Sequence, residues 1–353
     1  MISTIRLQHF RSYSDAFFEL DEGVNIIVGP NASGKTNLLE AVLIAARGSS
    51  YKAKDGELIQ FGQDWARLDA VTPAGTRIVK IKAEPTPGKS FEIDGQTVAR
   101  LHQTKTLPTV LFEPNHLLLM SGSPDLRRTF LDDLIEQTES GFGATRRHYR
   151  RVLAQRNSLL KKNPQDIAEQ LFVWNVRLSE LGGQIAKRRQ ALVTRFNDLA
   201  PELYVHLAGR NNQISLGYAS RFNLDHYESQ LLHKLESSTE LDILRGFTAY
   251  GPHRDDLEVL IDGHPMQESA SRGETRTLVL ALKILELQIL EEARDQQPIL
   301  LLDDVFSELD AKRRQALTHY VEQYQTFITT TDADIVAQYF ALTNQITLEV
   351  PKA

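Results

Sequence analysis

The sequence predicts an α/β fold of about two domains, in which a head of mixed sheet and helices is interrupted by a mostly α-helical arm. Three observations lead to this fold class. A strand, a glycine-rich loop and a helix follow one another at residues 16–47. An apolar strand that ends in two aspartates lies far downstream, at 299–304. Between them, apolar residues recur at helical spacing over residues 124–208.

Each element follows from its local pattern. β-Branched and aromatic residues predict strands at 3–13 and 16–29. Pro-Gly, Ala-Gly and Asp-Gly turn signals divide residues 67–99 into short alternating runs, which are typical of antiparallel strands. A mixed segment runs to about residue 244, and the chain beyond residue 270 predicts a long helix, a strand at 298–306, a helix, and strands at 326–331 and 345–350. We therefore expect the N-terminal part of the head at 1–118, the helical arm at 119–244 and the C-terminal part of the head at 245–353.

The composition excludes several classes of protein. The 353 residues contain no cysteine, so disulfides, zinc–thiolate sites and thiol nucleophiles are excluded. The N-terminus is charged by residue 6 and has no apolar core, which argues against a secretory signal. No apolar run approaches the roughly 20 residues that a membrane helix needs. We expect a cytoplasmic protein that associates with the nucleoid and not with a membrane.

A phosphate-binding loop is predicted at 29–36, where "GPNASGKT" matches G-x-x-x-x-G-K-[ST] between a strand and a helix. Backbone N–H groups of such a loop wrap the phosphates, and the positive end of the following helix adds to the attraction. Lys35 would reach the β- and γ-phosphate oxygens, and the Thr36 hydroxyl would ligate Mg²⁺. The residues expected to bind the nucleotide here are Gly29, Pro30, Asn31, Ala32, Ser33, Gly34, Lys35 and Thr36.

The acidic strand "ILLLDDVFSELD" at 299–310 supports a nucleotide site independently. Four apolar residues before two aspartates indicate a buried parallel strand whose carboxyl end lies at the ligand-binding edge of a sheet. Asp303 would hold Mg²⁺, and Asp304 would orient or deprotonate the attacking water, with Lys35 as the second catalytic residue. The alternative is that the two acids only begin a turn. Lys35 and Asp303 lie 268 residues apart, so a large insertion divides the nucleotide-binding core.

A second helix start is predicted at 271–276, "SRGETR", where a small residue and a glycine open a strongly helical run. The question is whether this helix start binds a phosphate. Free N–H groups, a hydroxyl and the helix dipole would suit the γ-phosphate of a nucleotide held by another copy of the chain. Two copies would then close face to face around two ATP molecules. The alternative is an ordinary capping box, because Glu274 follows Ser271 by three residues.

These motifs together resemble the ABC-type ATPases. Residues 270–274 are similar to the signature motif of that group, and "SELD" at 307–310 to its D-loop. The opening "LQHFRSYSD" resembles the SMC-like branch, and the whole chain resembles the bacterial RecF family of that branch. The stretches that carry the RecF resemblance are 10–13, 29–41, 111–132, 250–258, 271–276 and 300–310. The resemblance implies an ABC-type head with an inserted helical arm, and it adds Arg11, Asn37, Ser271, Arg272, Gly273, Glu274 and Asp310 to the nucleotide-binding residues.

The chain departs from the family pattern at three places. His116 stands where an acidic residue is usual, which leaves the Q-loop role near Glu113 unassigned. The switch histidine is missing, and Thr330 or Asp332 of "TTTD" would have to sense the γ-phosphate. Arg272 replaces the first glycine of the signature motif and adds a cation there.

The resemblance implies a function in DNA repair, replication and recombination, including the SOS response. Members bind ATP, form homodimers on it, bind double-stranded DNA near single-strand gaps, and act with RecO and RecR to load RecA. Hydrolysis would be slow, stimulated by DNA, and would reset the dimer. Two alternatives are the ATPase subunit of another complex, such as a transporter, and a small-molecule kinase with the same phosphate loop.

A basic run offers candidate DNA contacts on a chain whose net charge is −6. Residues 146–162 contain seven Lys and Arg and no carboxylate. Such cations give salt-sensitive binding that ignores base sequence. Our candidates are Arg146, Arg147, Arg150 and Arg151, and their alternative role is pairing with carboxylates of the head. The stretch "YGPHRDDLE" at 250–258 suggests either a hydrolase or metal site, or acids and Arg254 that fasten a turn.

Overall fold

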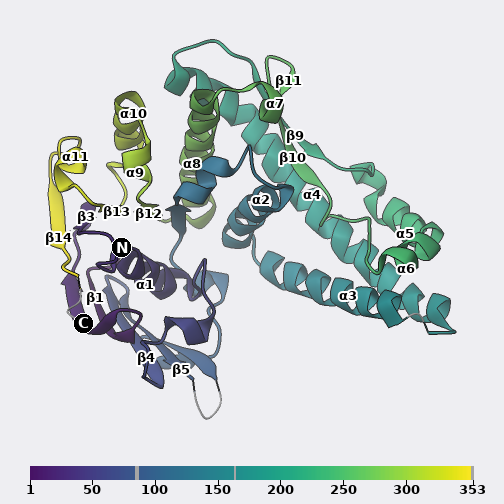
Figure 1. Cartoon of the computed structure of the whole chain (residues 1–353), viewed down its shortest axis with the longest axis horizontal. Helices are drawn as coiled ribbons and strands as arrows, with labels where there is room; N and C mark the ends of the chain where they lie inside the picture. The colour runs from purple at the N-terminus through teal and green to yellow at the C-terminus, as the bar shows by residue number, and fades with distance from the viewer. Residues whose placement is uncertain (84–86, 163, 351–353) are drawn as a thin grey trace. The chain divides into compact units, whose positions relative to one another are not determined.

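The computed structural model describes residues 1–83, 87–162 and 164–350, which form two compact units (Figure 1). Unit 1 contains Met1–Leu117 and Glu286–Ala353, and unit 2 contains Leu118–Leu285. The long helix α8 (Arg272–Arg294) contributes residues to both units. No helix within the described ranges is long and apolar enough to cross a membrane.

Unit 1 contains two sheets. The first is a five-stranded parallel sheet in the order β14 (Thr343–Thr347), β3 (Val24–Val28), β13 (Thr326–Thr330), β12 (Ile299–Asp303) and β8 (Thr109–Phe112). The second is an antiparallel sheet in the order β2 (Tyr13–Glu19), β1 (Thr4–Phe10), β4 (Trp65–Thr72), β5 (Gly75–Lys82), β6 (Gly88–Ile93) and β7 (Gln96–Val98). The predicted antiparallel region is therefore present, next to a parallel sheet that carries the acidic strand.

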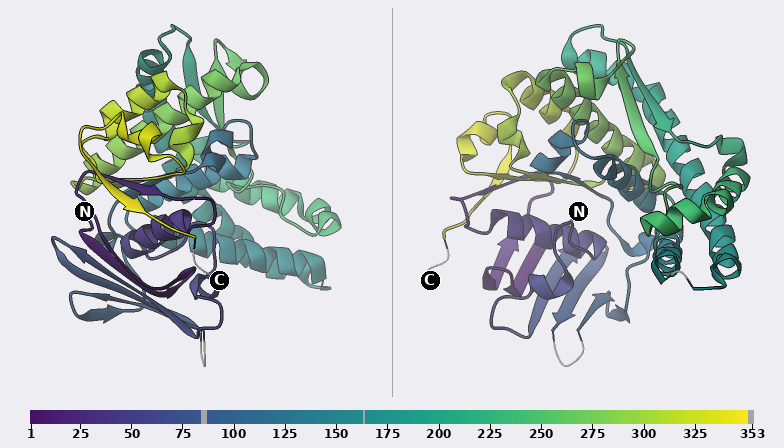
Figure 2. Two further views of the ribbon diagram at one scale, coloured as in Figure 1. Left: turned by 60° about the vertical axis from the view of Figure 1, so that its left-hand side comes forward. Right: turned by 45° about the vertical axis from the view of Figure 1, so that its right-hand side comes forward.

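Helix α1 (Lys35–Arg47) contacts both sheets of unit 1 (Figure 2). Its apolar residues form part of the main core. Besides its part of α8, the described residues of this unit form the helices α9 (Val305–Glu308), α10 (Ala311–Val321) and α11 (Ala333–Ala337). Single turns of 3₁₀-helix lie at Asp55–Leu58, Gln103–Lys105 and Pro114–Leu118. The core fixes both the end of β3 and the start of α1, between which the glycine-rich loop is held.

The strand predicted at 16–29 is divided in the structure. It covers the end of β2, a turn at residues 20–23, and β3. The Asn25 side chain closes the turn, because its Oδ1 accepts from the N–H of Asp21 at 2.7 Å and its Nδ2 donates to the Asp21 carbonyl at 2.9 Å. Asp, Asn and Gly favour such turns, so the polar residues interrupt an otherwise strand-like run.

Unit 2 is mostly helical. It contains α2 (Pro124–Thr138), α3 (Phe142–Lys162), α4 (Ile167–Ala208), α5 (Tyr227–Ser237), α6 (Thr239–Arg245) and α7 (Met266–Ser269). Helices α3 and α4 pack against each other, and they meet at the end that lies near α5 and α6 (Figure 1). A small antiparallel sheet in the order β11 (His264–Pro265), β10 (Asp256–Ile261) and β9 (Ile214–Ala219) packs on α2 and α4. A 3₁₀ turn at Leu224–His226 precedes α5.

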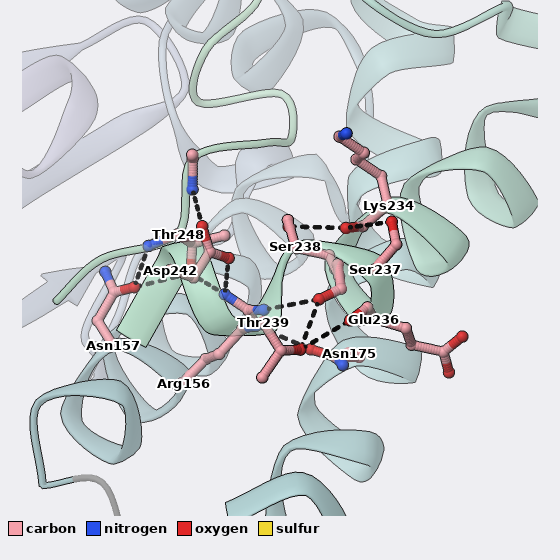
Figure 3. A network of polar contacts seen from close by, with 12 residues as sticks. Arg156, Asn157, Asn175, Lys234, Glu236, Ser237, Ser238, Thr239, Asp242 and Thr248 are labelled. Atoms are coloured by element: carbon pink, nitrogen blue, oxygen red, sulfur yellow. Dashed lines mark hydrogen bonds and ion pairs between the residues drawn. The ribbon is translucent and has the colours of Figure 1, made fainter. Parts of the chain in front are cut away.

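A buried arginine ties four helices of unit 2 together (Figure 3). Arg156 of α3 donates to Asn175 of α4 at 2.7 Å and to the Asp242 carboxylate of α6 at 2.8 Å. It also donates to the Thr248 hydroxyl and to the Leu235 carbonyl at the end of α5. A buried charge is tolerated only when it is paired and hydrogen-bonded, and this one meets both conditions.

Residues 245–285, which we expected in the C-terminal part of the head, fold with the helices of unit 2. The reason is strand pairing: β10 pairs with β9 in antiparallel register, with Asp256 opposite Ala219 and Ile261 opposite Ile214. Helix α2 also contacts β10. These long-range contacts join the segment to the preceding helices, and its local sequence pattern did not indicate them.

Candidate nucleotide-binding site

The glycine-rich loop joins β3 to α1 and has the backbone shape that its glycines allow. Gly34 has φ of 99°, a left-handed conformation in which a side chain would be strained. A Cβ at Gly29 would lie 2.5 Å from the Leu348 carbonyl oxygen, so only glycine fits that approach. Lys35 Nζ donates to the carbonyls of Gly29 and Pro30 at 2.8 and 3.0 Å. Its ammonium group is thus held inside the loop, where it would meet a phosphate.

Ser33 shows that this loop suits a phosphate. The residue is 3% exposed, and its buried Oγ has no hydrogen-bond partner among the described residues. A buried hydroxyl without a partner is costly, and a phosphate oxygen would satisfy it. The N-terminus of α1 and the Lys35 ammonium add positive charge beside it. The loop therefore fits the anionic group that its sequence predicts.

Asp303 at the end of β12 gathers hydroxyl groups from three other segments. Thr36 Oγ1 donates to Asp303 Oδ1 at 3.0 Å, although the two residues are far apart in sequence. The other two donors were not foreseen from sequence: Thr329 Oγ1 donates to Oδ1 at 2.9 Å and Tyr51 OH to Oδ2 at 3.1 Å. Three hydroxyl donors satisfy the oxygens of this buried carboxylate. The sequence-predicted metal ligands Thr36 and Asp303 thus lie together.

Asp304 follows in a strained backbone conformation. Its φ is 55°, in the left-handed region that residues with a Cβ rarely adopt. Its N–H donates to Thr329 Oγ1 at 2.8 Å, which helps to fix this geometry. Burial, and secondly the neighbouring charge of Asp303, raise the pKa of the Asp304 carboxyl. Strain and a raised pKa at one carboxylate are features of functional sites.

The "FRSY" turn contacts the phosphate loop and α1. Arg11 has φ of 53°, and its guanidinium forms two hydrogen bonds to Glu40, a fully buried carboxylate on α1, at 2.9 and 3.1 Å. Asn37 Nδ2 donates to Ser12 Oγ at 3.0 Å, and Tyr13 OH donates to the Gly34 carbonyl at 3.0 Å. The turn therefore braces the loop, and Arg11 stands beside α1 with a carboxylate partner that the sequence did not reveal.

The other residues considered for unit 1 make local hydrogen bonds in this structure. Asp310 Oδ1 accepts from the N–H of Arg313 at the start of α10, and Asp332 Oδ1 accepts from the N–H of Asp334 at the start of α11. Thr330 Oγ1 donates to the Asp332 carbonyl at 3.0 Å. His116 Nδ1 accepts from the N–H of Glu113 at 3.0 Å.

At the start of α8, Ser271 and Glu274 form the capping box that was the alternative to a phosphate site. The N–H and Oγ of Ser271 donate to Glu274 Oε2 at 2.8 and 2.7 Å, and the N–H of Glu274 donates back to Ser271 Oγ at 3.3 Å. These hydrogen bonds lower the pKa of Glu274. Arg272 is exposed beside them. The capping box is therefore present at this helix start.

The basic helix α3 divides into paired and exposed cations. Arg146 is only 12% exposed, and it forms ion pairs with Asp132, Asp133 and Glu136 of α2. Arg147 pairs with Glu136 at 3.4 Å. Pairing was the alternative role for these residues, but the carboxylates belong to α2 of the same unit and not to the head. Burial argues against Arg146 as a DNA contact, whereas Arg150 and Arg151 are exposed.

The "YGPHRDDLE" stretch has structural partners. Tyr149 OH lies 2.6 Å from His253 Nδ1, both Tyr218 and Tyr227 donate to Asp255 at 2.9 Å, and Arg127 forms two hydrogen bonds to Asp256. The described part of the chain holds no cluster of His, Asp and Glu suited to a metal ion. Of the two interpretations, these contacts favour acids that fasten a turn.

The chain is similar to known proteins along nearly its whole length. The model of the RecF/RecN/SMC N terminal domain matches residues 1–349. The DNA replication and repair protein RecF of Synechococcus sp. (strain JA-3-3Ab) is 35% identical over 342 residues, which cover 93% of this chain and 90% of the relative.

Two solved structures resemble the fold closely. The recombination mediator protein RecF-ATPrS in the RecFOR pathway matches with a TM-score of 0.89, at 28% identity, over 99% of this chain and 97% of that one. RecF-ATP of the same pathway matches with a TM-score of 0.83, at 29% identity, over 94% and 92%. This likeness confirms the predicted fold class, an ABC-type head with a helical arm. The chain therefore belongs to the RecF family of DNA replication and repair proteins.

Proposed function

We propose that this chain is an ATP-dependent, DNA-binding recombination mediator. Two copies close on ATP, and the dimer binds duplex DNA beside single-strand gaps and helps RecO and RecR to load RecA. The observation that carries this proposal is the hydrogen bond from Thr36 Oγ1 to Asp303 Oδ1 at 3.0 Å. It lies next to a loop whose buried Ser33 hydroxyl has no hydrogen-bond partner among the described residues. The similarity to the solved structure of RecF-ATP in the RecFOR pathway supports both the nucleotide and the pathway. Association with the nucleoid stays a prediction.

The residues of the site have separate tasks. Lys35, whose ammonium group donates to two loop carbonyls, would donate to phosphate oxygens instead when a nucleotide is bound. The hydroxyl of Thr36 and the carboxylate of Asp303 would hold Mg²⁺, which when bound neutralises charge on the phosphates. Asp304, whose carboxyl has a raised pKa, is suited to accept a proton from, or orient, the attacking water. Slow hydrolysis, stimulated by DNA, would then release the dimer.

The exposed cations of α3 suit an interface that binds DNA regardless of its base sequence. Arg150 and Arg151 of α3 face solvent, and Lys161 and Lys162 continue the cationic side of that helix. Contacts from such residues to phosphates provide affinity without base recognition. The two alternatives, a transporter subunit and a small-molecule kinase, lose their support, because the similarity to RecF proteins extends over 93% of the chain.

Sedimentation velocity with and without ATP tests the proposal. We expect the wild-type protein to sediment as a dimer in ATP and to bind gapped duplex DNA more tightly than in the absence of nucleotide. Lys35→Met should remain a monomer in ATP, because the loop loses its only lysine. A dimer population in Lys35→Met equal to that of the wild type would contradict the proposal, as would a wild-type protein that stays monomeric with ATP and DNA.

A further inference from the structure

Tyr51 approaches the acidic strand from a loop that carries no recognised motif. The loop follows α1, and Tyr51 OH donates to Asp303 Oδ2 at 3.1 Å. The other two donors, Thr36 and Thr329, both bind Oδ1. Among the hydrogen bonds of the described residues, Tyr51 is the one side-chain partner of Oδ2. Oδ1 of Asp303 thus accepts from two threonines, and Oδ2 accepts from Tyr51.

The loop that carries Tyr51 is itself anchored to α1. Ser50 Oγ donates to the buried Glu40 in a short hydrogen bond. The same oxygen accepts from the N–H groups of Lys52 and Ala53 at 3.0 and 2.9 Å. Glu40 is fixed in turn by its two hydrogen bonds from Arg11. The Tyr51 hydroxyl is therefore placed by a connected set of polar contacts that begins at the "FRSY" turn.

We propose that Tyr51 is a positioning residue for Mg²⁺ at the nucleotide site. By holding Oδ2, Tyr51 sets the rotation of the Asp303 carboxylate relative to Thr36, and these two residues would hold the ion. The inference rests on the proposed ATP and Mg²⁺ binding, and it adds a residue that acts through the Asp303 carboxylate. Partners that orient a metal-binding carboxylate commonly change metal affinity about 10- to 100-fold when they are removed.

The test compares the Mg²⁺ requirement of Tyr51→Phe with that of the wild type. Binding of a ribose-labelled, non-hydrolysable ATP analogue is followed by fluorescence, first in EDTA and then during a Mg²⁺ titration. We expect the Mg²⁺ concentration at half-saturation to rise about tenfold in Tyr51→Phe. The affinity for the analogue in EDTA should stay unchanged, because phosphate contacts remain. A role in folding alone would shift both quantities or neither.

Tyr324→Phe is the matched control. Tyr324 also lies in unit 1, and its hydroxyl donates to a carboxylate, Glu291 Oε2, at 2.6 Å. Its removal deletes the same chemical contact at a position that is not part of the proposed site. We expect wild-type Mg²⁺ dependence in this variant, whatever its melting temperature. If Tyr51→Phe does not fold, Ser50→Ala is the second variant. It removes the anchor of the loop to Glu40 but keeps the Tyr51 hydroxyl, and the Mg²⁺ concentration at half-saturation should rise in this variant too.

Two further variants separate failure of this inference from failure of the proposed function. Thr36→Ala should lose the Mg²⁺ effect, and Lys35→Met should lose analogue binding. If the wild type binds no analogue, or binds it without any Mg²⁺ effect, the nucleotide site itself is wrong. If those variants behave as expected and Tyr51→Phe has a half-saturation equal to or below that of the wild type, the role of Tyr51 is overturned.

Discussion

The guanidinium of Arg156 lies 2.8 Å from the carboxylate of Asp242, and neither side chain reaches solvent. The pair joins α3 to α6 inside unit 2. Taking two charges out of water is expensive, so such a pair persists only while each charge keeps its partner. The pair is therefore a requirement of this fold more than a net source of stability.

Arg156→Met should destabilise unit 2 strongly, because it leaves the Asp242 charge buried without its cation. We expect the free energy of unfolding to fall by about 3–5 kcal/mol, measured by urea denaturation with circular dichroism. The double variant Arg156→Met/Asp242→Leu should recover much of that loss, since it removes both charges. Equal losses in the single and double variants would show that the contacts of Arg156 with Asn175, Thr248 and Leu235 dominate instead.

Ser271→Arg tests whether the start of α8 contacts the nucleotide of a second copy. The substitution removes the capping hydroxyl and adds a bulky cation, so ATP-dependent dimerisation should be lost while binding of a labelled ATP analogue persists. Ser237→Arg, at an exposed serine of α5, is the control and should dimerise normally. Wild-type sedimentation of Ser271→Arg in ATP would leave Ser271 as a helix cap only.

Arg150→Gln/Arg151→Gln tests the basic helix. If both cations contact phosphates, affinity for DNA should fall for every sequence, and the slope of log K against log salt should become shallower by up to about 2. Arg177→Gln removes an exposed arginine of α4 that pairs with Glu180, and it should leave the slope unchanged. A double variant with the wild-type slope would place the DNA contacts elsewhere.

The phosphate loop and the acidic strand could be predicted because their chemistry is local. The loop motif "GPNASGKT" and the pair Asp303–Asp304 each occupy one short segment with a fixed order. Tyr51 and Thr329 also donate to Asp303, but nothing in their own segments indicates it. Their roles depend on the approach of a loop and a neighbouring strand, which only the tertiary fold creates.

Two other features of the structure could not be predicted from the sequence, for related reasons. Helical periodicity placed Arg146 on a cationic face, but it could not show that α2 presents Asp132, Asp133 and Glu136 to that arginine. Residues 256–261 have the pattern of a strand, and pattern alone did not show that β9 is the partner. Pairing partners lie far apart in the sequence, so single-segment signals give the element and not its neighbour.

His253 predicts how stability depends on pH. The Thr248 carbonyl can only accept a hydrogen bond, so His253 Nε2, which lies 3.1 Å from it, carries the proton and donates. Nδ1 is then unprotonated and accepts from Tyr149 OH. Burial lowers the pKa of His253 to about 4. An unfolded histidine has a pKa near 6.5, so between these values the unfolded chain binds more protons and acid favours unfolding. Asp255, whose pKa burial raises, acts in the opposite direction.

We therefore expect His253 to lower the free energy of unfolding by about 2 kcal/mol between pH 7 and pH 5. His253→Gln cannot titrate, so its loss of stability over that range should be smaller than that of the wild type by this amount. Urea denaturation at the two pH values measures the difference. His233→Gln, at an exposed histidine of α5, should keep the wild-type dependence. Parallel pH profiles for the wild type and His253→Gln would mean that the buried ring takes up its proton without cost.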